Sequence, residues 1–237
     1  MTNPDSHPTR HLATGVAATV YVAAWLIGLA VLPSGPDASG SAGTIRSALA
    51  AHAGAAVLQS WLVHGVAAVA LVCFVRSALR LLGCRCGGPA LHRLTLWSVQ
   101  AAAAASLVQV AFLHLAVAAA TRSAASTGDA PAAWFHAVNV TDVVKLALLG
   151  VVVAGLTRGL ATAGAPAWFT RPATGLAVAL PVAGLACVTT APLLGGTLAP
   201  SLVLLLVWAG VAAVLVARRT RRGAAPSGTT ERKTTWA

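Results

Sequence analysis

Residues 139–155 read NVTDVVKLALLGVVVAG, an apolar run long enough to cross a membrane, with Asp142 and Lys145 near its beginning. These two residues are the one oppositely charged pair within a hydrophobic segment of this sequence. Charged side chains are costly inside a bilayer, and where they occur they usually mark a functional site. The pair is therefore the best indication in the sequence of chemistry beyond membrane insertion.

The composition places the rest of the chain in a membrane as well. Of the 237 residues, 57% are hydrophobic and 9% are charged, and the mean hydropathy is +0.80. A soluble domain carries about 25% charged residues, so a soluble fold is excluded. The sequence predicts an all-α fold, a polytopic transmembrane helical bundle whose many Ala and Gly residues allow close helix packing.

Six hydrophobic segments are expected to form transmembrane helices. A polar segment, residues 1–10, precedes them, and a basic, disordered tail, residues 218–237, follows. A short interfacial helix is expected over residues 44–52, with Ile45 and Leu49 on one side. A tight turn is expected at residues 195–200, where two Gly and a Pro occur. The six predicted helices cover about residues 11–32, 53–75, 95–119, 138–156, 174–194 and 201–217.

The arginines predict the orientation of this bundle. Arg158, Arg171 and the C-terminal arginines fall on one side of the membrane, whereas Arg46 and Arg122 fall on the other. Because cytoplasmic loops carry the excess of Lys and Arg, both termini are expected in the cytoplasm and the protein in a bacterial plasma membrane. The net charge of +11 is explained in this way, without nucleic acid. The expected partners are the lipid bilayer and either another membrane protein or a second copy of the chain.

The depths of the polar side chains predict a cluster in the outer half of the membrane. At 1.5 Å per residue, Asp142 and His114 lie about 6 Å below the outer boundary, and the other polar residues of helices two to four lie at roughly 9 to 16 Å. Short connections make these helices neighbours. The candidate ligand or ion site consists of Asp142, Lys145, His64, His114, Gln59 and Gln109.

Two interpretations of these residues stay open. In the structural one, Asp142 and Lys145, three residues apart, pair on their own helix, and the Gln and His side chains join helices by hydrogen bonds. The protein is then a structural or partner-binding membrane component. In the functional one, the six residues line a polar cavity for an ion, a proton or a small polar ligand, as in a small transporter or sensor.

No catalytic residue, metal or cofactor is expected. His64 and His114 differ by about 10 Å in depth, which suits two axial haem ligands poorly. Zinc ligation by the outer histidines and Asp142 has no supporting spacing. Cys84 and Cys86 form a weak motif on the cytoplasmic side, where thiols stay reduced. With five acidic residues in the chain, carboxylate-based catalysis has little material, so a non-enzymatic role is expected.

Several stretches, in this order, are similar to those of a known type of protein. They are FVRSALR at the end of the second predicted helix, VNVTDVVKL and LTRG at the two ends of the fourth, a turn with Pro and Trp, and LLLVWAGVAAVLVARR in the sixth. Over nearly all of residues 12–222 the chain resembles uncharacterised small six-span integral membrane proteins typical of high-GC actinobacteria. The resemblance implies a six-helix membrane fold and no catalytic residue or substrate.

Overall fold

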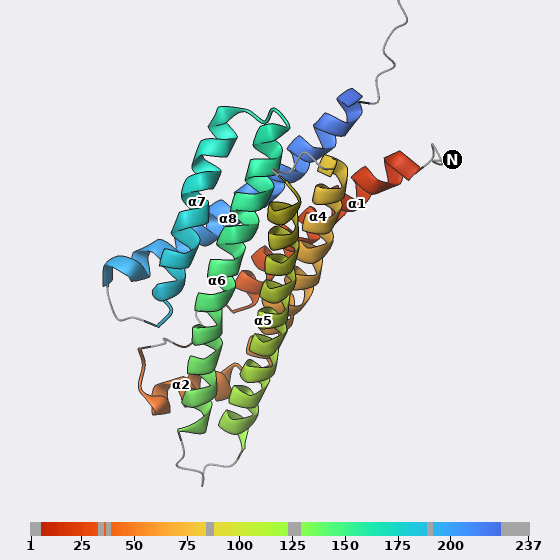
Figure 1. Cartoon of the computed structure of the whole chain (residues 1–237). Helices are drawn as coiled ribbons and strands as arrows, with labels where there is room; N and C mark the ends of the chain where they lie inside the picture. The colour runs from red at the N-terminus through yellow and green to blue at the C-terminus, as the bar shows by residue number, and fades with distance from the viewer. Residues whose placement is uncertain are drawn as a thin grey trace, which may run out of the picture.

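The computed structural model describes residues 6–32, 36, 39–83, 88–122, 129–188 and 192–223. Regular structure within these ranges is entirely helical, which confirms the predicted all-α class. Figure 1 shows an elongated bundle of long helices with one short helix at its lower end. The helices are α1 (Ser6–Val31), α2 (Ala42–Ala51), α3 (Ala53–Ser60), the π-helix η1 (Trp61–Val66), α4 (Ala67–Leu82), α5 (Pro89–Thr121), α6 (Ala130–Thr162), α7 (Ala167–Leu185) and α8 (Pro192–Gly223).

Five helical runs in the described ranges have the length and apolar composition needed to cross a membrane. The second of them is continuous from α3 through η1 to α4. The chain is therefore a multi-pass membrane protein. The five runs are Leu12–Val31, Ala53–Leu82, Pro89–Thr121, Ala130–Thr162 and Thr197–Arg219.

The helix α7, which holds most of the predicted fifth span, is not among these five. It has 19 residues, and Arg171 and Pro172 lie in its first turns, so its apolar part is short. It ends at Leu185, and residues 189–191 of the predicted span fall outside the described ranges. The crossing of α7 stays a prediction.

Most helices are longer than the predicted apolar segments. The second predicted helix extends to Leu82 instead of residue 75, and the fourth spans Ala130–Thr162 instead of 138–156. Because a helix satisfies its own backbone groups in water and lipid alike, it can continue past the apolar core that hydropathy detects. For the same reason α1 begins at Ser6 and α8 extends to Gly223, so parts of both predicted tails are helical.

The predicted tight turn at residues 195–200 is wrong. These residues belong to α8, which begins at Pro192 and contains Pro200 in its interior. The break between the last two helices therefore lies before Pro192. A proline at the first position of a helix leaves no hydrogen bond unmade, whereas the two glycines remain compatible with a helix that other helices support.

The short helix predicted over residues 44–52 is confirmed as α2. Ser41 caps its first turn, with the Ser41 hydroxyl accepting a hydrogen bond from the amide of Thr44 at 3.2 Å. Ile45 and Leu49 are each 1% exposed and pack in a cluster with Val117 and other residues of α5 and α6. The helix α2 is therefore fixed against the lower end of the long helices (Figure 1).

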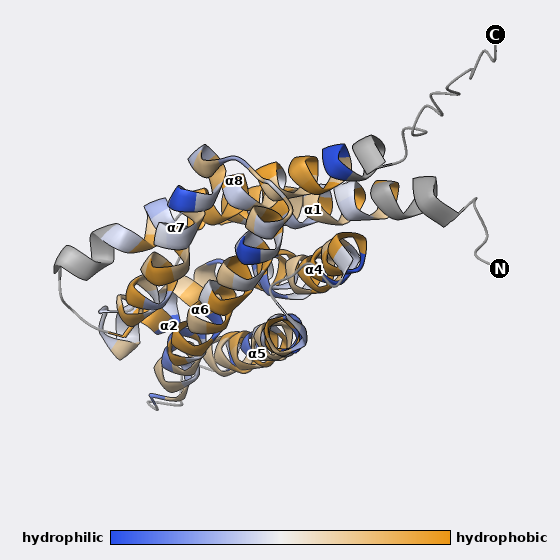
Figure 2. Cartoon of the chain, turned by 45° about the horizontal axis from the view of Figure 1, so that its top comes forward, coloured by the Kyte–Doolittle hydropathy of each residue, from blue (hydrophilic) through white to orange (hydrophobic). Residues whose placement is uncertain are grey.

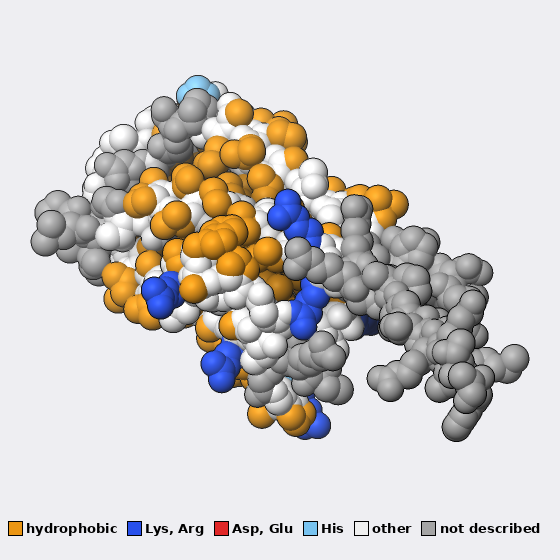
Figure 3. Space-filling view, turned by 90° about the horizontal axis from the view of Figure 1, so that it is seen from above, with side chains coloured by type: hydrophobic (Ala, Val, Ile, Leu, Met, Phe, Trp, Pro, Cys, Tyr) orange, Lys and Arg blue, Asp and Glu red, His pale blue; other side chains and the backbone are white. Residues whose placement is uncertain are grey.

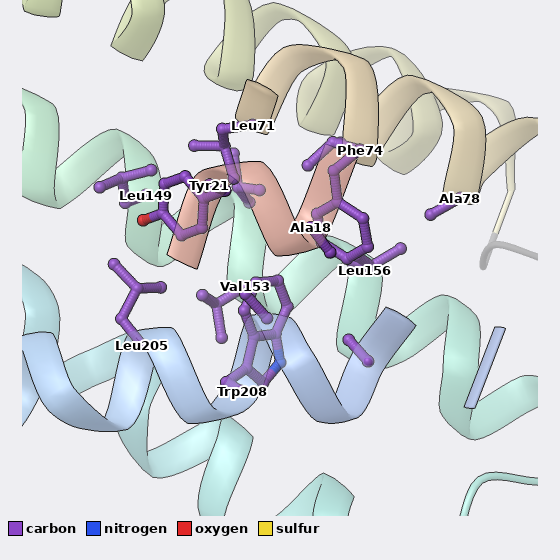
Figure 4. Packing of buried hydrophobic residues seen from close by; sticks show 14 of the residues in the cluster. Ala18, Tyr21, Leu71, Phe74, Ala78, Leu149, Val153, Leu156, Leu205 and Trp208 are labelled. Carbon is purple, nitrogen blue, oxygen red and sulfur yellow. The ribbon is translucent and has the colours of Figure 1, made fainter. Parts of the chain in front are cut away.

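The helix α6 is central to the bundle. It packs against α5 and α7 over long stretches and also contacts α2, α4 and α8. In Figure 4, Leu149, Val153 and Leu156 of α6 face Tyr21 of α1 and Trp208 of α8. The Trp208 indole also donates a hydrogen bond to the hydroxyl of Thr157, on α6, at 3.1 Å.

Glycines on α6 allow its neighbours to approach closely. A methyl group at Gly150 would lie 2.6 Å from the carbonyl oxygen of Ala177 on α7, and one at Gly155 would overlap the hydroxyl of Thr95 on α5. Real side chains do not reach such distances, so these crossings require glycine. These two glycines therefore allow the close helix packing that the composition predicted.

One end of the bundle carries several arginines. Figure 1 places the beginning of α1 and the last described turns of α8 at the same end of the bundle. Arg80, Arg93 and Arg158 lie within a few residues of helix ends on that side. Seen from above in Figure 3, described Lys and Arg side chains are visible on this face, and Asp and Glu side chains are not.

Candidate functional site

The ammonium group of Lys145 is the centre of a polar cluster inside the bundle. The residue is 4% exposed. Its Nζ lies 2.5 Å from Asp142 Oδ1, 2.7 Å from Gln109 Oε1 and 3.2 Å from His64 Nδ1. An ammonium group has three donors, so each donor has its own acceptor. We call these four residues the Lys145 cluster.

The cluster joins three helical segments. Asp142 and Lys145 are three residues apart on α6 and therefore share a face. Gln109 comes from α5 and is fully buried; its amide nitrogen donates to the backbone carbonyl of Val138, on α6, at 3.0 Å. This bond directs the Gln109 carbonyl oxygen toward Lys145. His64 completes the cluster from η1.

His64 is carried by an unusual helical segment. In η1 the backbone widens to a π-helix, so that the amide of Ala67 bonds the carbonyl of Leu62, five residues back. Such segments are rare and frequently occur at functional sites. Gly65 makes room for this geometry, because a methyl group there would lie 2.8 Å from the Trp61 ring.

The Trp61 ring connects η1 to α5 on the other side of the turn. Its indole nitrogen donates to His114 Nε2 at 3.3 Å, and the two rings meet edge to face. His114 Nδ1 lies 2.7 Å from the carbonyl oxygen of Val110 and therefore donates to it. The sequence analysis did not identify Trp61. The available signal was its position within a predicted span, three residues before His64.

The structure brings together four of the six predicted site residues and separates Gln59 and His114 from them. Gln59 donates to the carbonyl oxygen of Leu32 at 3.3 Å, at the end of α1. Gln59 is five residues from His64, and His114 is five residues from Gln109. Five residues turn an α-helix by about 140°, so His114 does not share a face of α5 with Gln109. The depth estimate from sequence contained no information about this rotation.

A cavity of about 20 Å³ lies against Lys145, and its lining includes Tyr21 of α1 and Ser106 of α5. A single water molecule needs roughly 10–15 Å³ of such space. The cavity therefore has room for about one water and excludes an organic ligand. The chemistry that fits is that of water, a proton or a small ion.

The protonation states of the cluster follow from its hydrogen bonds. Because the Lys145 ammonium only donates, His64 Nδ1 must accept, and the imidazole is neutral with its proton on Nε2. The Asp142 carboxylate then balances the charge of Lys145. A proton added at His64 Nδ1 would remove an acceptor and place a second cation beside Lys145.

The predicted alternatives with metals find no support in this geometry. Within the described ranges, no three His, Cys, Asp or Glu side chains gather as metal ligands would. Both ring nitrogens of His114 are already engaged. Cys84 and Cys86 lie outside the described residues.

Comparisons with protein-family models, with curated proteins and with solved structures find no match for this chain. The function is therefore argued from the geometry of the Lys145 cluster.

Proposed function

We propose that this is a non-enzymatic, six-span protein of the plasma membrane, with both termini in the cytoplasm, whose Lys145 cluster responds to protons. The topology is supported by α7, which packs along α6 and contacts α8. It is also supported by the described ends of α1 and α8, which lie together at the arginine-bearing end (Figures 1 and 2). With six spans, this end faces the cytoplasm.

The observation that supports proton sensing is the contact between two basic groups, Lys145 and His64. The two nitrogens are 3.2 Å apart, and the contact requires a neutral imidazole. Histidine is the side chain that most readily changes charge between pH 5 and 8. Protonation of His64 therefore breaks one of the three hydrogen bonds of Lys145.

The segment η1 gives this change a structural consequence. Its π-helical bonds and the Trp61–His114 contact hold one arrangement of the turn, and repulsion between His64 and Lys145 favours another. The hydroxyl of Ser60, directly before η1, is buried without a hydrogen-bond partner in this arrangement. Such an unsatisfied group lowers the cost of rearranging the turn.

A purely structural role is the second candidate. Its support is that the three donors of Lys145 are all matched, as expected of a fixed connection between α5, α6 and η1. The two candidates differ in what a change of pH does to η1.

The test is hydrogen exchange of the backbone amides of residues 59–70, measured by mass spectrometry in nanodiscs between pH 8 and 3 and corrected for the intrinsic effect of pH. We expect a cooperative rise in exchange as the pH falls in the wild-type protein, and no such rise in His64→Gln, which retains an acceptor but cannot take up a proton. His136→Gln, at an exposed histidine of α6 outside the Lys145 cluster, is the matched control and is expected to retain the transition.

A transition of unchanged midpoint in His64→Gln would refute proton sensing at His64. A flat profile in the wild-type protein would favour the structural role. Proton flux into proteoliposomes, followed with an internal pH-sensitive dye, separates a transporter from a sensor.

A further inference from the structure

A second hollow, unrelated to the Lys145 cluster, runs along the outer surface between α1 and the η1–α4 segment. It has a volume of about 610 Å³. Val16 and Val20 of α1 form one wall, and Val69 and Cys73 of α4 form the other, with Trp61 and Gly65 of η1 at one end. We call it the α1–α4 groove.

The lining of the groove excludes a polar ligand. Apart from the thiol of Cys73, the side chains that line it are apolar. The one other polar group, the indole N–H of Trp61, is used by His114. Gly65 and Cys73 lie near the middle of the span Ala53–Leu82, so the groove opens toward the hydrocarbon of the bilayer and not toward water.

The size of the groove favours one hydrocarbon chain over a transmembrane helix. A helix with its side chains is about 10–12 Å across, so a 12 Å length of it fills roughly 900 Å³ or more and could lie only partly within the groove. A methylene group is close in size to a water molecule, which occupies about 30 Å³. The groove therefore holds about twenty such groups, the size of one lipid chain.

We propose that the α1–α4 groove is a binding site for one acyl chain of a membrane phospholipid. Val16, Val69 and Trp61 are each at least half exposed in the isolated chain and become covered when it is occupied. The bound chain contacts Trp61 and Gly65 of η1.

The test is retention of palmitoyl-oleoyl phosphatidylglycerol by the purified full-length protein, counted by native mass spectrometry after transfer from nanodiscs into detergent. Val69→Trp fills the groove from α4. Val207→Trp is the matched control, because both valines are exposed to a similar degree, 60% and 56%, and Val207 does not line the groove. We expect one lipid on the wild-type protein and on Val207→Trp, and at least a tenfold lower occupancy on Val69→Trp.

Equal retention by Val69→Trp and the wild-type protein would overturn the proposal, as would a wild-type protein that retains none. Where Val69→Trp fails to fold, Ala13→Trp fills the same groove from α1 and decides the question. A variant with Cys73 as its only cysteine tests the other occupant. Efficient disulfide formation between copies in bicelles would assign the groove to a second copy of the chain and contradict the lipid site.

Discussion

At the scale of single residues, Lys145 is the one lysine or arginine that is buried among the described residues. Its side chain is 5% exposed, whereas that of Asp142 is 22% exposed, so the carboxylate marks the more open side of the pair. A buried ion pair is stable only while both partners and their remaining hydrogen bonds are present. Gln109 and His64 supply those additional bonds, which explains how a lysine is accommodated within an apolar helix.

We predict that removing one member of this pair is more damaging than removing both. Lys145→Met leaves Asp142 buried without its counter-charge and should lower the free energy of unfolding by about 3–5 kcal/mol. The double variant Asp142→Asn/Lys145→Met should recover most of the loss, because it leaves no unpaired charge. Unfolding in detergent, followed by circular dichroism, measures both. A double variant as unstable as the sum of the two single variants would show that the residues act independently.

At the scale of helices, glycine positions decide which faces of α6 approach its neighbours. Gly155 meets Thr95 of α5, and Gly150 meets the backbone of α7 at Ala177. In lipid, helices associate largely through such close contacts, because apolar side chains gain little by leaving hydrocarbon. The α5–α6 crossing in turn sets the distance from Gln109 to Lys145, so packing and the polar cluster are coupled.

The corresponding prediction compares two glycines that differ in their surroundings. Gly155→Ala places a methyl group against Thr95, and overpacking of this kind costs about 1–3 kcal/mol. Gly210→Ala, on α8, meets nothing within 4 Å, and alanine favours a helix by up to about 1 kcal/mol. Thermal unfolding in the same detergent should therefore give a lower Tm for Gly155→Ala and an equal or higher Tm for Gly210→Ala. The opposite order would contradict the close α5–α6 crossing.

At the scale of the whole molecule, the number of spans depends on α7. If α7 crosses the membrane, α8 returns the chain to the side on which it began. If α7 stays on the cytoplasmic side, the C-terminus lies outside. The packing of α7 along α6, through Gly150 and through Gly184 against Val143, favours the crossing.

Reporter fusions decide between these topologies. We predict that green fluorescent protein fused after Ala237 is fluorescent and that alkaline phosphatase at the same position is inactive, because the proposed topology places both termini in the cytoplasm. Alkaline phosphatase inserted after Arg122, between α5 and α6, should be active and serves as the external control. An active phosphatase at the C-terminus would exclude six spans.

Hydropathy and composition in the sequence determined the helical class, the approximate positions of the long helices, and α2 with its buried Ile45 and Leu49. They also identified Asp142 and Lys145, because a charged residue within an apolar segment can be recognised from the sequence alone. The end of the second helix and the start of α8 could not be predicted, because helices continue beyond the apolar segment and a proline can begin or interrupt them.

Only the tertiary structure decided which polar residues meet. Depth along a helix, and the angle between two of its side chains around the axis, can be counted from the sequence, but the rotation of each helix toward its neighbours depends on the crossings of α5, α6 and η1. That rotation brings Gln109 and His64 to Lys145 and turns His114 toward Trp61. The π-helix η1 was also decided by the tertiary structure. The local sequence does not favour a π-helix, and neighbouring helices must hold it.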